Sequence, residues 1–191
     1  LKRMNVDNYT DVGIAAGAEF ERGLVDGHAT AVARLEELFT VAAWVGDTII
    51  ISMKAPCLKL FNISNASVYT WAGNCEIAST IPPADGAAIG EARLNNIYSM
   101  AVSSNSSVYL AQDPGYMRII YGDTLTVRTL FGGPTGTGVN GGLDVATLDA
   151  TSGTAVAWAF NALYFGAKFG SKIRKLDEGT MTVSHVAGTT H

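Results

Sequence analysis

The chain has 191 residues, of which 48% are hydrophobic and 16% charged, and its formal net charge at pH 7 is −4. This apolar share excludes a disordered chain, and the length suffices to bury a hydrophobic core. A nucleic-acid-binding surface is excluded as well, because neutralising phosphates needs a broad basic face and the sequence has no basic cluster. No apolar stretch approaches the roughly 20 residues of a membrane-spanning helix.

Residues 1–17 form an N-terminal lead with one strand-like segment, at residues 9–16. This segment runs into the sequence IAAG at 14–17, which is similar to the ends of later segments. We therefore expect an orphan strand from a preceding structural unit. It is predicted to add to a sheet edge of another chain, or of a missing part of the same chain.

After the lead, one pattern is repeated three times. VARL, which ends at Leu35, returns as EARL ending at Leu94 and as VATL ending at Leu148. An Asp-Gly or Asn-Gly pair precedes each copy, and a basic residue within an apolar run follows each copy. These markers are Asp26-Gly27, Asp85-Gly86 and Asn140-Gly141, then Lys59, Arg118 and Lys172. The repetition predicts three units, at residues 18–73, 74–133 and 134–191.

Each unit contains four short runs rich in β-branched and aromatic residues, separated by Gly, Pro, Asn, Asp and Ser. Such runs predict strands, and four strands per repeat are typical of a β-propeller blade. One or two helical turns are expected within 29–38. The predicted strands are 39–45, 48–53, 57–63 and 67–72, then 97–103, 107–112, 116–121 and 126–131, then 154–160, 162–168, 172–177 and 181–187.

The fold class is therefore all-β, with three four-stranded antiparallel blades of an incomplete or oligomer-completed propeller. First strands are expected to line the channel side, with Val41, Ala43, Met100, Val102, Val156 and Trp158. Second strands are expected to pack between blades, with Ile49, Ile51, Val108, Leu110, Leu163 and Phe165. Three blades do not close a ring of the usual four to eight, so the ends of the arc are expected to associate.

The order of these motifs resembles the NHL-repeat β-propeller family. The third unit carries the resemblance most plainly, in SKIRKLD at 171–177 followed by VSHVAG at 183–188. The similarity extends from about Ile14 to Gly188, although the units are longer than the commonest NHL repeat. It implies a propeller fold and no particular activity, because function resides in sites carried by the scaffold. Some NHL propellers are lyases that use a metal held by channel histidines, and no matching histidine set is present.

Two cysteines, Cys57 and Cys75, bracket the last two predicted strands of the first unit. A hairpin brings such positions together, so the spacing predicts a disulfide, with two unpaired thiols as the alternative. A disulfide is typical of secreted proteins.

Four acceptor sequences for N-glycosylation point to the same compartment, at Asn8, Asn62, Asn65 and Asn105. The last three fall in predicted turns, where a glycan is solvated. The alternative is that Asn- and Ser-rich turns produce such sequences by chance. Together with the cysteines, they predict an extracellular or cell-surface location.

No catalytic, cofactor-binding or metal-ligating set is recognisable. The three histidines, His28, His185 and His191, do not share a motif, and the Gly-rich segment 134–142 lacks the features of a phosphate loop. Asp26 and Asp85 occupy matching loops and would bind a cation if they lined one mouth, although Asp-Gly is more often a simple turn. The basic run 172–175 is interpreted as a strand with alternating solvated side chains.

The sequence thus predicts a non-enzymatic NHL-like module for protein–protein interaction or surface assembly, glycosylated and without a cofactor. Its expected partners are other copies of the chain or missing blades of a longer one. Two alternatives stay open. One is a fragment of a propeller enzyme, lyase or hydrolase-like, whose active residues lie in missing blades. The other is an intracellular NHL scaffold.

Overall fold

The computed structural model describes residues 1–4, 12–17, 21–76, 83–134, 140–143, 146, 154–166 and 172–188. Every regular element within these ranges is a β-strand, and the strands form three five-stranded sheets and one two-stranded sheet. Of the helix predicted within 29–38, only a single turn forms, in which the amides of Val32 and Ala33 donate to the carbonyl of His28. The twelve predicted strands are all present, with small differences at their ends.

The three large sheets are the predicted blades, each built as a meander of four antiparallel strands. Blade 1 contains β4 (Leu38–Ala43), β5 (Thr48–Met53), β6 (Cys57–Asn62) and β7 (Ser67–Gly73). Blade 2 contains β9 (Ile97–Val102), β10 (Val108–Gln112), β11 (Tyr116–Ile120) and β12 (Thr126–Gly132). Blade 3 contains β14 (Ala155–Ala159), β15 (Ala162–Gly166), β16 (Lys172–Asp177) and β17 (Thr182–Gly188).

Each blade also has a fifth strand that the sequence did not predict. These strands are only two residues long and follow the Asp or Asn of the repeated Asp-Gly and Asn-Gly pairs. They are β3 (Gly27–His28), β8 (Gly86–Ala87) and β13 (Gly141–Gly142), and they pair antiparallel with β7, β12 and β17 respectively. The segment that precedes each blade in sequence therefore forms the outer edge of that same blade.

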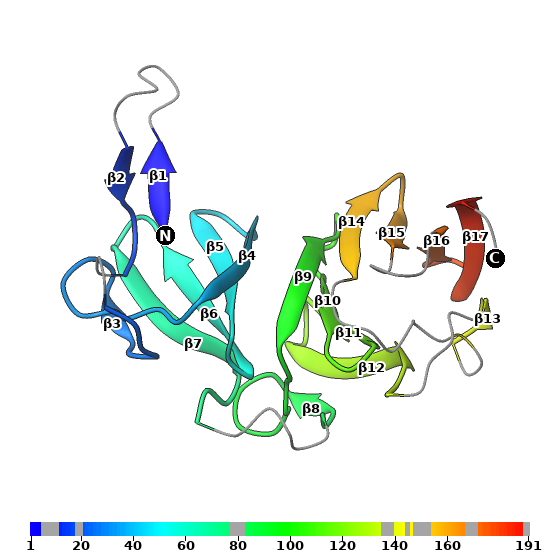
Figure 1. The fold of residues 1–191 in the computed structure, drawn as a ribbon, viewed down its shortest axis with the longest axis horizontal. Helices are drawn as coiled ribbons and strands as arrows, with labels where there is room; N and C mark the ends of the chain where they lie inside the picture. The colour runs from blue at the N-terminus through cyan, green and yellow to red at the C-terminus, as the bar shows by residue number, and fades with distance from the viewer. Residues whose placement is uncertain are drawn as a thin grey trace.

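The three blades stand side by side in an arc, with β4, β9 and β14 on the inner side and the outer strands pointing away (Figure 1). The side chains between blades form two apolar clusters. The first joins blades 1 and 2 through residues such as Ile50, Leu58, Leu60, Met100, Val108 and Leu110. The second joins blades 2 and 3 through residues such as Tyr109, Met117, Ile119, Leu163, Phe165 and Leu176.

Polar contacts between blades add to this packing. The Ser52 hydroxyl donates a hydrogen bond of 2.7 Å to the carbonyl of Ile97, across the first interface. At the second interface the Tyr109 ring stacks on Trp158, with centroids 5.5 Å apart, and its hydroxyl donates to Glu178. Burial, with help from the Glu178 hydrogen bond, raises the pKa of Tyr109, so this hydroxyl stays protonated as a donor.

The predicted second-strand core is confirmed at five positions. Ile51, Val108, Leu110, Leu163 and Phe165 are all buried, because each faces one of the apolar clusters on the side of the preceding unit. Ile49, the sixth, is only partly buried.

The first strands lie on the inner side of the arc, as predicted, but the named residues differ in burial between the blades. Met100 is buried, and Val102, Val156 and Trp158 pack against the two inter-blade clusters. They do so because each faces the preceding blade. Val41, by contrast, is 47% exposed and Ala43 is also exposed, because no inner strands of a preceding blade cover them among the described residues.

The N-terminal lead also departs from the prediction. Part of the predicted strand 9–16 lies outside the described residues, and its described part is β2 (Val12–Ile14). It is not an orphan, because it pairs antiparallel with β1 (Lys2–Met4), which the sequence did not predict. The two strands form a hairpin beside blade 1.

Candidate functional site

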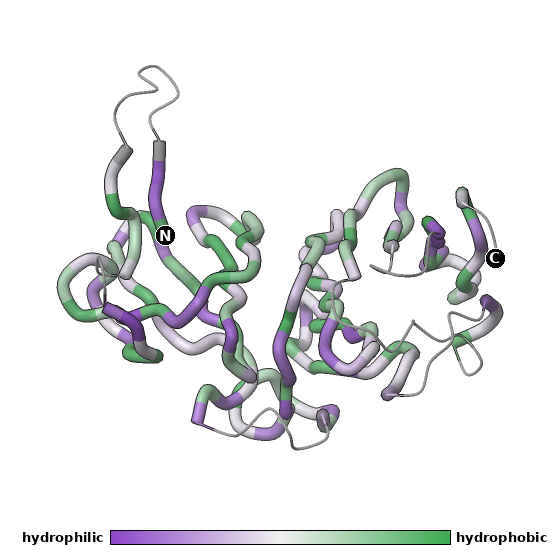
Figure 2. The backbone as a smooth tube through the Cα atoms, viewed as in Figure 1, coloured by the Kyte–Doolittle hydropathy of each residue, from purple (hydrophilic) through white to green (hydrophobic). Residues whose placement is uncertain are grey.

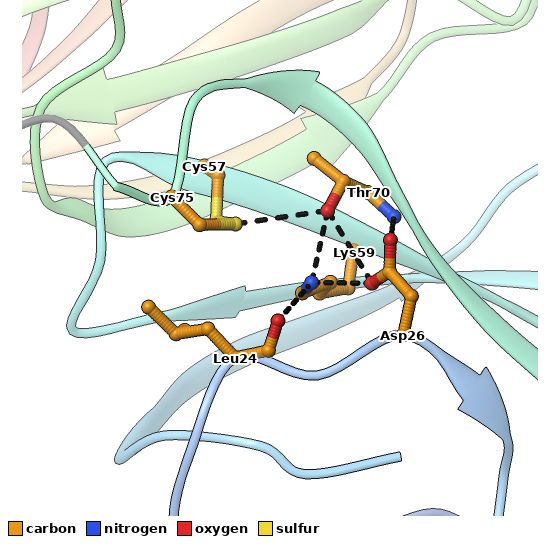
Figure 3. A network of polar contacts seen from close by, with 6 residues as sticks. All are labelled: Leu24, Asp26, Cys57, Lys59, Thr70 and Cys75. Carbon is orange, nitrogen blue, oxygen red and sulfur yellow. Dashed lines mark hydrogen bonds and ion pairs between the residues drawn. A yellow bond between two sulfur atoms is a disulfide. The ribbon is translucent and has the colours of Figure 1, made fainter. Parts of the chain in front are cut away.

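The most elaborate polar site of blade 1 is centred on the buried cation of its third strand (Figure 3). Lys59, only 1% exposed, donates from Nζ to the carboxylate of Asp26, to the carbonyl of Leu24 at 2.8 Å and to Thr70 Oγ1 at 2.9 Å. The amide of Thr70 donates to the second Asp26 oxygen at 2.9 Å. A register shift between Leu58 and Lys59 places Lys59 opposite Thr70 on this face. The site therefore ties the Asp-Gly loop to the two outer strands.

Blade 2 repeats the arrangement with an arginine. Arg118, fully buried, donates to Asp85 Oδ1 at 2.8 Å and to the carbonyls of Ala84 and Arg93 at 2.7 and 2.6 Å. Thr129 donates to the same carboxylate from both its amide and its hydroxyl. A register shift again precedes the cation, between Met117 and Arg118.

In blade 3, the prediction that Lys172 is the third copy of the basic residue is wrong. The residue equivalent to Lys59 and Arg118 is Arg174 and not Lys172, because a register shift again precedes it and it faces His185, where the other blades have threonine. Arg174 is buried, so the prediction of solvated side chains along 172–175 is wrong at this position. Its guanidinium lies 5.0 Å from the centre of the Phe165 ring. Asn140 stands where the other units have aspartate.

The charges of the first two sites determine how they titrate. Burial by itself raises the pKa of the Asp26 carboxyl, but the hydrogen bonds from Lys59 and Thr70 outweigh it, so the pKa lies below its usual value. Burial lowers the pKa of Arg118, and the hydrogen bond and charge of Asp85 oppose this effect. An arginine still stays protonated at any physiological pH. Both sites therefore hold an ion pair, Lys59 with Asp26 and Arg118 with Asp85.

Asp26 and Asp85 thus do not line a common mouth. Each holds the cation of its own blade, and the predicted alternative of a cation bound by the two together is not supported by this geometry. Among the described residues, no group of three or more His, Cys, Asp or Glu side chains is placed to hold a metal ion. His28 lies in blade 1 and His185 in blade 3, so they are not brought together, and His191 lies outside the described residues.

The disulfide predicted between Cys57 and Cys75 is present, and it borders the blade 1 site (Figure 3). Thr70 Oγ1 lies 3.7 Å from the Cys75 sulfur, so one hydroxyl contacts both the ion pair and the disulfide. An open pocket of about 430 Å³ lies beside them. Its lining is Leu24, Asp26, Thr70, Gly73, Asn74, Cys75, Glu76, Ile89 and Gly90.

Replacing Cys75 by alanine is expected to lower the free energy of unfolding by about 2–4 kcal/mol, because the bond closes a loop of 18 residues in the unfolded chain. Urea titration of the native and variant proteins measures the difference. As a control, thiol labelling of the unreduced native chain should find no free cysteine. Full labelling of both cysteines would contradict the prediction.

The acceptor asparagines that the structure describes lie at one end of the strands, in or beside turns. Asn65 and Asn105 are exposed, and Asn62, at the end of β6, is partly buried. In the Asn105 sequence the side-chain oxygen accepts a hydrogen bond of 3.1 Å from the amide of Ser107, which fixes the turn. Asn8 lies outside the described residues.

Sequence reasoning missed the two threonines that complete the ion-pair sites. The signal was present, because Thr70 and Thr129 occupy the same place in VYTWAG and VRTLFGG. The position of Arg174 was missed for another reason. Only the register shift shows which basic residue of KIRK faces inward.

The search for known relatives gives a fold and no family: no family model matches the chain, and no curated protein matches it. Several solved structures are similar to the chain. The WD40 repeats of RRP9 are similar with a TM-score of 0.53 and 14% identity, over 91% of this chain and 43% of that one. U3-55K is similar with a TM-score of 0.53 and 13% identity, over 83% of this chain and 41% of that one. A Bacteroides thetaiotaomicron protein of unknown function is similar with a TM-score of 0.45 and 11% identity, over 93% of this chain and 50% of that one.

The chain thus spans half or less of the length of these structures. At this identity the likeness establishes the fold alone. Together with the three antiparallel blades, it defines the chain as consecutive blades of a β-propeller. Within the described ranges, no helix is long and apolar enough to cross a membrane.

Proposed function

We propose that the chain is a non-enzymatic, NHL-like propeller module that binds other proteins and takes part in an extracellular or cell-surface assembly. Its NHL character is supported by the order of an Asp-Gly loop, a buried basic residue on the third strand and a glycine at the end of the fourth strand. Binding takes place through apolar inter-blade surface left uncovered at the end of the arc.

The outward face of blade 3 is the observation that carries this proposal. Leu58 in blade 1 and Met117 in blade 2 are fully buried against the next blade, whereas the equivalent Ile173 of blade 3 is 48% exposed. Trp71 is buried, whereas the equivalent Val186 is 45% exposed. Because the first two blades use these positions for packing, the same positions on blade 3 form an interaction surface for a further blade.

The partner that fits this surface is another blade of the same type. The face of blade 3 keeps the apolar pattern of the inter-blade clusters at Ile173, Val186 and Tyr164. It departs from the pattern at Lys175, which stands where the other blades have Leu60 and Ile119. A second copy of the chain supplies such a blade, as does further sequence in a longer chain. Repetition of the contact gives a closed ring if the rotation between successive copies completes a full turn, and an open filament if it does not.

Replacing Ile173 by aspartate is expected to abolish association of the chain, because the contact then buries an unpaired charge. Light scattering should report particles larger than 20.0 kDa for the native chain and a monomer for the variant. Ile63→Asp is the matched control, because Ile63 is 53% exposed but lies in a turn of blade 1. A native chain that is monomeric at all concentrations would rule the contact out.

An extracellular location is supported by the disulfide and by the exposure of Asn65 and Asn105. Enzymatic deglycosylation of the protein from a eukaryotic host should lower its apparent mass. The decrease should be reduced in Asn65→Gln and Asn105→Gln variants and absent when Asn62 is replaced as well, unless Asn8 is occupied. An unchanged mass on deglycosylation of the native chain would argue against this modification.

A further inference from the structure

A small open pocket lies between blades 2 and 3, at the end of the strands that carries the Asn105 turn. Its volume is about 230 Å³, and its lining comes from both blades. The strands of these blades carry hydrophobic residues interrupted by hydrophilic ones (Figure 2). Besides Asn105 and Ser107, the lining consists of Tyr109, Ile119, Tyr121 and Leu130 of blade 2 and of Glu178 and Met181 of blade 3.

The equivalent place between blades 1 and 2 is filled by two indole rings. Trp44 and Trp71 pack against each other there, with ring centroids 4.7 Å apart, and both contribute to the first apolar cluster. The strand register makes Ser103 the equivalent of Trp44 in the next blade, and Leu130 the equivalent of Trp71. Both replacements are smaller than a tryptophan, and the pocket is the space that they leave.

Polar groups also enter this interface where the first interface has none. Tyr109 stands at the place of Ile50, and Glu178 stands at the place of Gly122. The buried Tyr109 hydroxyl donates to Oε1 of Glu178. Because burial raises the pKa of Tyr109, this hydroxyl remains a donor and holds the carboxylate at the edge of the pocket.

The charge of Glu178 is not balanced within the described part of the chain. The side chain is half-buried, and no described lysine or arginine forms an ion pair with it. Nor does any described residue donate to its second oxygen, Oε2. The buried Ile119 and Leu130 line the same pocket. A cation that enters is therefore partly removed from water, and the carboxylate attracts it more strongly than at an open surface.

Tyr121 adds an aromatic side chain to the pocket. It is half-buried and packs against the second apolar cluster. Aromatic rings attract ammonium groups, and the attraction is stronger where water is partly excluded. The remaining wall, formed by Ile119, Leu130 and Met181, offers apolar contact to an alkyl chain. A carboxylate, an aromatic ring and an apolar wall are together suited to an organic ammonium cation.

We propose that this pocket binds a small organic cation, a primary ammonium group on a short alkyl chain, with Glu178 as its counter-ion and Tyr121 as its aromatic contact. The small volume of the pocket restricts the ligand to a small molecule. The site is a further function of the chain and does not rest on the proposed protein contact. It is formed by two adjacent described blades and uses neither Ile173 nor Val186 of the outward face of blade 3.

The probe is butylammonium chloride, and butanol, which has nearly the same shape and no charge, is its control. Titrated into the full chain against matched sodium chloride, butylammonium is expected to shift the amide NMR signals of Tyr121, Glu178 and Met181. The expected dissociation constant is on the order of 1 mM, and butanol should bind about tenfold more weakly or less. The chain is produced in a bacterial host, because a glycan on Asn105 would crowd the pocket.

Variants of the chain assign the binding to this pocket. Glu178→Gln keeps an acceptor for Tyr109 but removes the charge, so it should weaken butylammonium binding by about tenfold or more. Tyr121→Leu should weaken binding about fivefold, and Tyr121→Phe should restore it. Glu76→Gln is the matched control and should bind like the native chain. Glu76 is an exposed carboxylate that lines the larger pocket beside the disulfide.

Three results would overturn the proposal. The first is a native chain whose signals do not respond to butylammonium. The second is an equal response to butylammonium and butanol, because the charge of the ligand then plays no part. The third is binding that Glu178→Gln leaves unchanged or that Glu76→Gln weakens as much, because the cation is then bound elsewhere. Ile173→Asp should bind butylammonium like the native chain, so a failure of the blade 3 contact is distinguishable from a failure of this site.

Discussion

Replacing Arg118 by alanine is expected to lower the free energy of unfolding by about 3 kcal/mol, because it leaves a cavity where a fully buried side chain stood and removes the charged donor from two backbone carbonyls. Its guanidinium donates to Asp85, to the carbonyls of Ala84 and Arg93 and, at 3.4 Å, to the side-chain oxygen of Gln112. Urea or thermal unfolding measures the loss.

Two further variants separate the ion pair from simple packing. Arg118→Lys should cost clearly less, because Lys59 already forms the equivalent contacts in blade 1. Arg128→Ala, on the neighbouring strand, should cost almost nothing, because this side chain is exposed. A loss for Arg118→Ala no greater than that for Arg128→Ala would show that the site does not stabilise the blade.

Replacing Gly132 by alanine is expected to destabilise the chain by about 3 kcal/mol, through backbone strain and a collision. Gly132 has a φ of 101°, and a Cβ atom there would lie 2.1 Å from the carbonyl oxygen of Gly115. That oxygen belongs to the backbone of a tight turn and has little freedom to move. Thermal unfolding should show the change as a lower midpoint.

The neighbouring glycine provides the control. A Cβ atom at Gly133 would have no atom within 4 Å, so Gly133→Ala should leave stability almost unchanged. Equal midpoints for the two variants would mean that the end of β12 does not approach the turn at Gly115, between β10 and β11, as closely as described. The same close approach occurs at Gly73, where a Cβ would lie 2.5 Å from the carbonyl oxygen of Pro56.

The strands could be predicted from the sequence because alternation and turn residues are local signals. The repeat also identified the loops of Asp26 and Asp85, although not their partners. The cations that they bind lie 33 residues further along the chain in each blade. Which basic residue of a strand turns inward depends on a register shift, and a single sequence does not display such a shift.

The edge strands and the exposure of Val41 were missed for a different reason. β3 and β8 are too short to show any periodicity, and each pairs with a strand far along the chain. Val41 has the sequence context of a core residue, and it is exposed because no described strand of a preceding blade covers it. Whether a residue at that position is buried depends on the neighbouring blade and not on the sequence of its own repeat.

The two-residue strands at the rim have a consequence for how molecules of this kind can meet. A long, bare outer strand would invite lateral pairing between rings, the contact from which amorphous or fibrous aggregates grow. Here β3, β8 and β13 close each rim with an edge too short to template another strand. Lateral growth is thereby disfavoured. The assembly that we propose would then extend only through the ends of the arc, in one dimension.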